Sequence, residues 1–112
     1  MTPLRAALIY TALPDAQTAR DIAKILLEER LVACANILGP IESVFLWNGK
    51  LDTSEEVGVL FKTASDQIEP AVTRMHALHP YETPAIVASA CDAAHDATLQ
   101  WLLEQTRGKS SS

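Results

Sequence analysis

The alternation of apolar and polar positions divides the chain into seven segments, of which the first two differ in period. Residues 4–12 form an apolar run that is typical of a β-strand. Residues 14–31 change to a helical period, and one face of the predicted helix collects Ala19, Ile22, Ala23 and Leu26. Asp15 precedes this face, where its carboxylate can accept hydrogen bonds from the unpaired backbone N–H groups of the first turn. The pattern therefore predicts a strand followed by a capped helix.

The middle of the chain returns to β character and contains a strong hairpin signal. Residues 32–50 are predominantly apolar, and Gly39–Pro40 indicates a bulge or bend part way along them. The dipeptide Asn48–Gly49 suits a type I′ turn, because both residues tolerate a positive φ. Strand character resumes at Lys50 and is strongest over residues 55–63. The sequence predicts a long β-hairpin.

The last third of the chain alternates between helix and strand. Residues 65–79 show one helical stripe made of Ile68, Val72, Met75 and His79. Because Pro70 is tolerated only in a first turn, we expect this helix to begin close to Glu69. Residues 85–91 form a short apolar strand. Residues 95–107 predict a closing helix whose inward side chains are Leu99, Leu102 and Leu103.

The order β-α-β-β-α-β-α predicts an α+β fold. Two βα units joined by a hairpin correspond to the ferredoxin-like split β-α-β sandwich, here with a long β-hairpin and an added C-terminal helix. A chain of 112 residues suits one domain, which we place at residues 1–107. We expect residues 108–112 to form a flexible tail.

The predicted strands are apolar on both faces of the sheet. Adjacent apolar pairs, which point to opposite faces, are Leu8–Ile9, Val44–Phe45, Val59–Leu60 and Ile86–Val87. Two helices cover only one face, so the second face needs another cover. In so short a chain, this pattern favours a homo-oligomer in which the long hairpin reaches a neighbouring subunit.

Composition excludes several classes of partner. The net charge is −5 and the sequence contains no cluster of lysine or arginine, so we expect no nucleic-acid and no anionic-membrane partner. No apolar run approaches the roughly 20 residues of a membrane span. The two cysteines, Cys34 and Cys91, form neither a disulfide framework nor a CxxC pair. Together with an N-terminus unlike a signal peptide, these features predict a cytoplasmic protein.

The stretch LHPYETPAIV, residues 78–87, concentrates candidate chemistry. His79 is either a histidine packed at a helix end or a metal ligand through a neutral imidazole nitrogen. His76 lies three residues earlier, but that spacing is common by chance. Pro80 and Pro84 fix the backbone around residues 81–83, which indicates either a stiff corner or a site with Glu82 as an oxygen ligand.

Other candidates for chemistry are sparse. Cys34 is either a small buried apolar residue or a thiolate ligand that would favour soft metals such as copper. Acidic residues after the hairpin turn resemble a solvated charge run, comprising Asp52, Glu55 and Glu56. The sequence contains no nucleotide-binding or hydrolase motif, and no grouping of nucleophile, base and orienting residue. On the residues alone, we do not expect an enzyme.

Four short motifs together resemble the CutA family of divalent-cation tolerance proteins: ACAN at 33–36, WNGK at 47–50, FKT at 61–63 and HPYETP at 79–84. The resemblance extends over nearly the whole chain. It implies a ferredoxin-like subunit in a tight homotrimer, similar in architecture to the PII-type signal transducers. It also implies binding of Cu²⁺ or another divalent cation, a role in metal tolerance, and no organic cofactor.

The resemblance also implies a cleft shared between subunits. Its metal ligands would be His79, Glu82 and Cys34, and its other lining residues would be Trp47, Lys62 and Tyr81. Two positions depart from some family members, since Tyr10 stands where they have cysteine and Leu78 where they have histidine.

Two functional hypotheses follow. The leading one is a non-enzymatic homotrimer that binds divalent cations, copper among them, in metal-ion tolerance. The alternative is a PII-like trimeric signalling scaffold whose inter-subunit clefts bind a small anionic ligand or a protein partner, with Lys62 supplying charge while Trp47 and Tyr81 stack. A third possibility is a trimer in which the cluster serves packing only.

Overall fold

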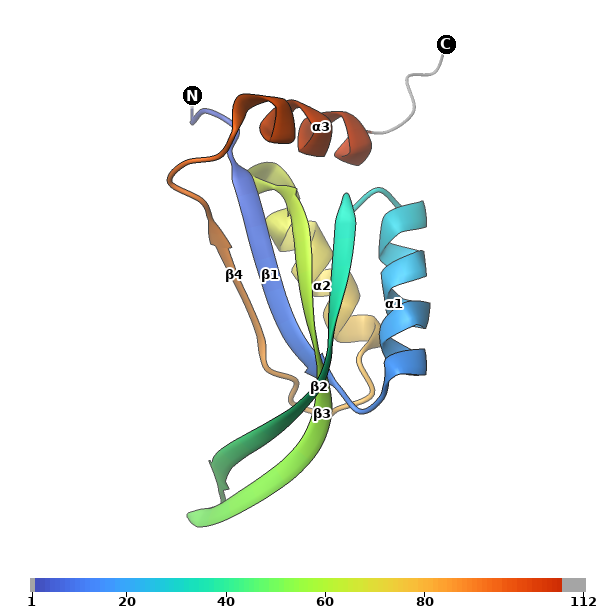
Figure 1. Ribbon diagram of the computed structural model, residues 1–112, viewed down its shortest axis with the longest axis vertical. Helices are drawn as coiled ribbons and strands as arrows, with labels where there is room; N and C mark the ends of the chain where they lie inside the picture. The colour runs from blue at the N-terminus through green and yellow to red at the C-terminus, as the bar shows by residue number, and fades with distance from the viewer. Residues whose placement is uncertain (1, 108–112) are drawn as a thin grey trace.

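The computed structural model describes residues 2–107 and contains the predicted elements in the predicted order (Figure 1). These elements are β1 (Ala6–Leu13), α1 (Ala16–Glu28), β2 (Cys34–Trp47), β3 (Lys50–Ala64), the 3-10 turn η1 (Ser65–Gln67), α2 (Ile68–Leu78), β4 (Ile86–Ala90) and α3 (Asp96–Thr106). The sequence prediction of four strands, two βα units and a closing helix is confirmed. The predicted tail at residues 108–112 lies outside the described residues.

The four strands form one antiparallel sheet in the order β2-β3-β1-β4. This order, with a helix after β1 and another after β3, is the predicted ferredoxin-like arrangement. Figure 1 shows α3 across one end of the sheet and the β2–β3 hairpin extending from the opposite end. None of the helices within residues 2–107 is long and apolar enough to cross a membrane.

The main core lies between one face of the sheet and helices α1 and α2. Alternate residues of β1 and β3 supply its sheet side, and each helix supplies one apolar stripe. Its largest fully buried side chains include Ile9, Leu13, Leu26, Val59, Phe61 and Met75. This packing fixes the positions of β1 and of the C-terminal end of α2, between which the candidate site lies.

Both helix starts follow the sequence prediction, but α2 ends one residue earlier than expected. The Asp15 carboxylate accepts the Thr18 N–H at 2.8 Å, and Pro70 is the third residue of α2. The predicted helix reached His79, whereas the structure ends α2 at Leu78 and gives His79 an extended ψ of 133°. Pro80 explains the difference, because a proline disfavours helical geometry in the residue before it.

The hairpin has the predicted turn and bulge. Asn48 and Gly49 have φ values of 51° and 77°, as a type I′ turn requires. The register of β2 against β3 shifts between Ile37 and Pro40, and Gly39 has a φ of 88° there. The bulge bends β2 where the hairpin leaves the sheet, so the outer arms curve away from the body (Figure 1).

Within residues 2–107, no third strand pairs with the outer half of the hairpin. Pairing of β1 with β3 ends at Leu13 and Val57, whereas β2 and β3 remain paired as far as Trp47 and Lys50. Exposed apolar side chains continue along this outer half, with Leu46 70% and Leu51 74% exposed. An isolated two-stranded hairpin is only marginally stable in water, so these arms require an external packing partner.

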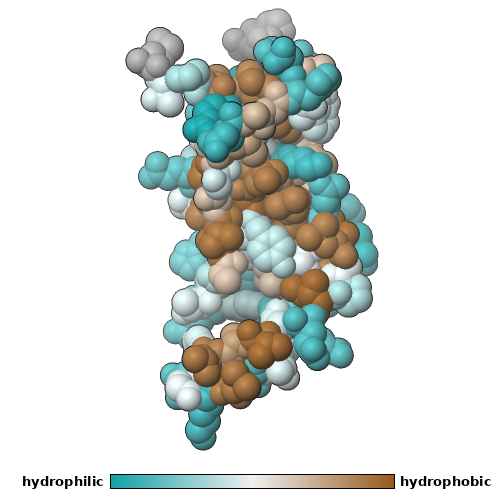
Figure 2. Space-filling model, turned by 60° about the vertical axis from the view of Figure 1, so that its left-hand side comes forward, coloured by the Kyte–Doolittle hydropathy of each residue, from teal (hydrophilic) through white to brown (hydrophobic). Residues whose placement is uncertain are grey.

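The sheet face opposite α1 and α2 is apolar, and no element of the described part of the chain covers it. Leu8, Tyr10, Leu60 and Val87 lie on it in register across three neighbouring strands, with Val87 64% exposed. Figure 2 shows apolar side chains gathered along the middle of the molecule and again on the hairpin. The prediction that both faces of the sheet are apolar is confirmed, and we call this uncovered surface the open face.

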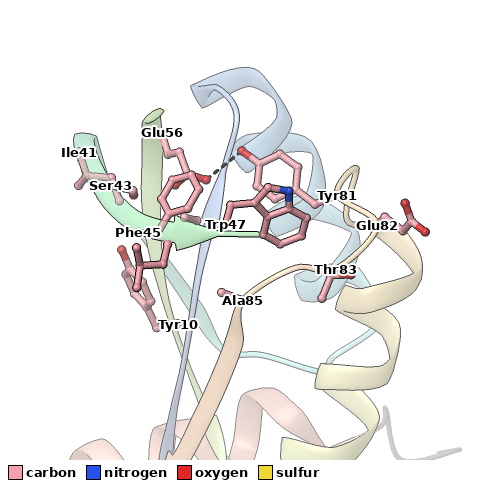
Figure 3. A pocket seen from close by; sticks show the side chains of 12 residues that line it. Tyr10, Ile41, Ser43, Phe45, Trp47, Glu56, Tyr81, Glu82, Thr83 and Ala85 are labelled. Atoms are coloured by element: carbon pink, nitrogen blue, oxygen red, sulfur yellow. Dashed lines mark hydrogen bonds between the residues drawn. The ribbon is translucent and has the colours of Figure 1, made fainter. Parts of the chain in front are cut away.

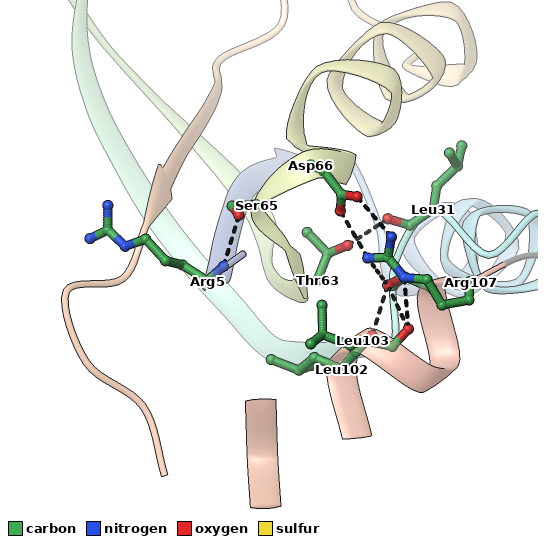
Figure 4. Close-up of polar contacts among 9 residues, drawn as sticks. Arg5, Leu31, Thr63, Ser65, Asp66, Leu102, Leu103 and Arg107 are labelled. Atoms are coloured by element: carbon green, nitrogen blue, oxygen red, sulfur yellow. Dashed lines mark hydrogen bonds and ion pairs between the residues drawn. The ribbon is translucent and has the colours of Figure 1, made fainter. Parts of the chain in front are cut away.

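Helix α3 is held to the sheet by a small apolar cluster and by polar contacts. Leu102 packs with Ala6 and Ala33, while Leu99 is partly buried beside them. Arg107 forms two hydrogen bonds to Asp66, at 2.7 and 2.9 Å (Figure 4). These contacts fix α3 at the end of the sheet away from the hairpin.

Candidate functional site

A groove of about 760 Å³ lies between the base of the hairpin, β1 and the segment that connects α2 to β4. Its lining is aromatic and acidic, as Figure 3 shows. The residues that line it are Tyr10, Ala12, Ile41, Ser43, Phe45, Leu46, Trp47, Glu56, Tyr81, Glu82, Thr83 and Ala85. The volume lies within the range of about 300–1,000 Å³ that is usual for small-molecule pockets.

Tyr81 and Glu56 close one side of this groove. The Tyr81 hydroxyl donates a hydrogen bond to Glu56 Oε2 at 2.9 Å (Figure 3). Burial, together with this carboxylate, raises the pKa of Tyr81 to about 12. The sequence had grouped Glu56 with a solvated charge run, which was wrong, because β3 turns its half-buried side chain toward Tyr81.

Behind Tyr81, His79 is buried and makes hydrogen bonds with β1. Its Nε2 lies 3.0 Å from the Ala12 carbonyl oxygen and 3.1 Å from Thr11 Oγ1. The Thr11 hydroxyl donates its own proton to the Ala85 carbonyl at 2.8 Å. Thr11 therefore accepts from His79 while it donates to the residue before β4, and the three segments are tied together.

The second ring nitrogen of His79 is occupied as well. Its Nδ1 accepts the backbone N–H of Tyr81 at 3.2 Å, which requires the proton of a neutral ring to sit on Nε2. Burial lowers the pKa of His79 and thus favours this neutral form. The imidazole is a structural member of the corner, and its ring bonds to β1 and to Tyr81, not to the last carbonyl groups of α2.

The residues of one chain do not fit a metal ion at His79. Both ring nitrogens are hydrogen-bonded, so in this conformation neither is available as a ligand. Within residues 2–107, no three His, Cys, Asp or Glu side chains are placed to hold one ion. The predicted ligand set of His79, Glu82 and Cys34 is therefore not assembled inside a single subunit.

Three of the six predicted residues lie outside the groove lining: His79, which is buried behind Tyr81, and Cys34 and Lys62. Cys34 and Lys62 face each other across β2 and β3, and Lys62 in turn faces Leu8 of β1. Alternation along these strands places both side chains on the open face. The Cys34 thiol lies 3.7 Å from Asn36 Oδ1. Of the six predicted residues, the groove lining brings together Trp47, Tyr81 and Glu82.

The profile of the CutA1 divalent ion tolerance protein family matches residues 7–105. The chain belongs to this family. The divalent-cation tolerance protein CutA of Pyrococcus horikoshii is 40% identical over 100 residues, which are 89% of this chain and 97% of that protein. Its counterpart in Thermus thermophilus is 38% identical over 98 residues, covering 88% and 95% respectively.

Solved CutA structures agree with the fold. The crystal structure of the divalent ion tolerance protein CutA1 from Ehrlichia chaffeensis matches with a TM-score of 0.88 at 36% identity. That match covers 95% of this chain and 99% of the Ehrlichia chain. The resemblance to the CutA family that the four sequence motifs indicated is confirmed.

Several residues of this CutA groove and of the buried corner behind it were missed at the level of sequence. Thr11 lies in an apolar run and gave no local signal, although a buried hydroxyl requires a partner. Tyr10 was noted only as a departure from some family members, yet it lines the groove. A side chain at Gly58 would place its Cβ 2.7 Å from the Tyr10 hydroxyl, so glycine allows the ring to lie over β3.

Proposed function

We propose that this CutA family member is a non-enzymatic homotrimer that binds divalent cations, with Cu²⁺ as the first candidate, and that this binding serves metal tolerance. The observation that supports it most is that this member of a divalent-ion tolerance family has two acidic residues at the groove, Glu56 inside it and Glu82 at its border with the carboxylate turned outward. Cations are the ligands that such a lining attracts.

The trimeric part of the proposal rests on the surfaces that one chain leaves uncovered. The open face and the outer hairpin both expose apolar side chains, and the hairpin lacks a third strand. A hairpin that packs on the open face of the next copy covers both at once. When this contact is repeated around a closed ring, the open face and the hairpin of every subunit are both covered.

The assembly also accounts for metal ligands that one chain does not bring together. Cys34 lies on the open face, whereas Glu82 borders the groove. Contact between neighbouring subunits would bring an open-face thiol toward a groove of another copy. His79 contributes to this site by positioning Tyr81 and the segment that connects α2 to β4. It is not a metal ligand in this arrangement, because both of its ring nitrogens are hydrogen-bonded.

Titration of the purified protein with Cu²⁺ in a calorimeter tests the proposal, combined with light scattering for the mass. We expect saturable binding at micromolar metal, weakened in Glu82→Gln and in Cys34→Ser. Glu104→Gln, which removes an exposed carboxylate on α3, is the matched control and should bind as the wild type does. Absence of binding to the wild-type protein would contradict the metal-binding function.

The PII-like scaffold is a second candidate because the groove has the size and the aromatic lining of a small-molecule pocket. Phe45, Trp47 and Tyr81 supply faces on which a planar ligand would stack. An anionic ligand would also need Lys62, which lies on the open face and would have to come from another subunit. A thermal-shift screen of metabolites tests this candidate, since a bound ligand raises the Tm by mass action.

A further inference from the structure

A smaller pocket of about 390 Å³ lies on the other side of the segment that carries Glu82. It opens between the last turns of α2 and the chain leading into β4. Helix α2 contributes Thr73 and His76 to its lining, and the connecting segment contributes Glu82 and Thr83. An imidazole, a carboxylate and two hydroxyls therefore border one cavity.

His76 differs from His79 in exposure and in the hydrogen bonding of its ring, which decide whether a ring nitrogen is available to a metal ion. It is exposed in the last turn of α2, whereas His79 is only 7% exposed. The ring of His76 makes no hydrogen bond to the other residues in the described part of the chain, so its nitrogens need not leave a partner to bind an ion. The HxxH spacing seen in the sequence is thus no chelating pair, because its two rings point to different environments.

Glu82 is placed for the same cavity. Its side chain is exposed and makes no ion pair with any described residue. Figure 3 shows its carboxylate turned away from Trp47 and Tyr81, toward the outside of the large groove. Pro80 and Pro84 restrict the backbone on both sides of it. The carboxylate is therefore carried by a stiff segment beside α2.

We propose that His76 and Glu82 bind one borderline divalent cation, Cu²⁺ or more weakly Zn²⁺, in this pocket. An imidazole nitrogen with a carboxylate oxygen suits these ions, and Cu²⁺ ranks above Zn²⁺ for such ligands. Both side chains are exposed and line the same pocket, and these ions take imidazole nitrogen and carboxylate oxygen ligands at about 2.0–2.2 Å. Water and the hydroxyls of Thr73 and Thr83 complete the coordination. This inference rests on the proposed function and names a ligand set for it within one chain.

The test uses Cu²⁺ alone with the full-length protein, read by calorimetry and by electron paramagnetic resonance. We expect a copper spectrum with nitrogen hyperfine coupling in the wild type. His76→Ala should abolish that coupling and lower the affinity about tenfold or more, and Glu82→Gln should lower the affinity comparably. His95→Ala removes another exposed histidine, at the start of α3, and should change neither quantity.

The possible outcomes separate the two proposals. If the wild type binds Cu²⁺ and His76→Ala retains both the affinity and the nitrogen coupling, the His76–Glu82 site is overturned while divalent-cation binding stands. If the wild type binds no Cu²⁺, both are overturned. Because His76 and Glu82 are exposed, neither substitution should prevent folding, and an unchanged Tm verifies this for each variant.

Discussion

Tyr81 donates its backbone N–H to Nδ1 of His79 over 3.2 Å, and the two rings lie with their centroids 4.8 Å apart. The same tyrosine donates its hydroxyl to Glu56 on β3. Tyr81 is therefore held at its backbone by a buried histidine and at its tip by a carboxylate. This arrangement makes one wall of the groove rigid before any ligand binds.

Removal of the His79 ring should destabilise the protein. His79→Ala leaves the Tyr81 N–H without its acceptor and the Ala12 carbonyl without its donor, and it opens a cavity beside β1. We expect a loss of about 2 kcal/mol in the free energy of unfolding, in the range for buried hydrogen-bonding groups. Urea unfolding at a fixed protein concentration measures it. His95→Ala, at an exposed site, should lie within about 0.5 kcal/mol of the wild type, and an equally small effect of His79→Ala would refute the structural role.

The buried imidazole should also make stability depend on pH. Burial lowers the pKa of His79 below its ordinary 6.5, while the hydrogen bond to the Ala12 carbonyl and the charge of Glu56 raise it and His76 lowers it, all by smaller amounts. The unfolded chain therefore takes up a proton before the folded chain does. The contribution of His79 is complete above pH 6.5 and decreases as pH falls through the folded-state pKa.

Thermal unfolding between pH 7.5 and pH 4.5 checks this sign. We expect the Tm of the wild type to fall as the pH is lowered below 6.5, and the fall to be smaller in His79→Ala. A wild-type Tm that rises as the pH is lowered from 6.5 would show that the ring is stabilised as a cation instead.

The phenol of Tyr81 should lose its proton only at a pH above the usual range for tyrosine. Its pKa is raised from 10.0 to about 12, because the ring is partly buried and its proton is shared with Glu56. The difference in absorbance at 295 nm between the wild type and Tyr81→Phe isolates this group. We expect the difference to develop near pH 12, and a step centred at pH 10 would exclude the Glu56 contact. Loss of the hydrogen bond in Tyr81→Phe should cost about 1 kcal/mol.

A charge on the open face should disrupt assembly, whereas the same charge on a helix should not. Leu8 on the open face and Leu27 on α1 are 38% and 39% exposed, so they form a matched pair. Leu8→Glu would bury a carboxylate against a neighbouring subunit, which is costly without a partner. We expect Leu8→Glu to lower the oligomer mass at micromolar concentration and Leu27→Glu to leave it unchanged. Equal masses for both variants would exclude the open face from the interface.

The sequence predicted the fold best at positions where the residue type restricts the backbone conformation. Asn48 and Gly49 specified the turn by their tolerance of positive φ, and Pro70 located the first turn of α2. The earlier end of α2 was also readable, because Pro80 excludes helical geometry at His79. Local rules were sufficient for these boundaries.

The candidate site was less predictable because its contacts join distant segments. Glu56 and Tyr81 are 25 positions apart, and Thr11 and His79 are 68 apart, so no local pattern relates them. His79 was predicted as a metal ligand because histidine is a common ligand. Its hydrogen bonds, which occupy both ring nitrogens, become visible only in the folded chain. Cys34 and Lys62 were assigned to the cleft by resemblance, whereas in one chain they lie on the open face.

The most direct test of this account is the solution mass, measured by sedimentation equilibrium at several micromolar concentrations. The uncovered sheet face and the unsupported hairpin predict a folded species of three times the chain mass of 12.2 kDa. A folded species of 12.2 kDa that keeps its Tm on dilution would contradict the account, because the open face would then be stable in water without a partner.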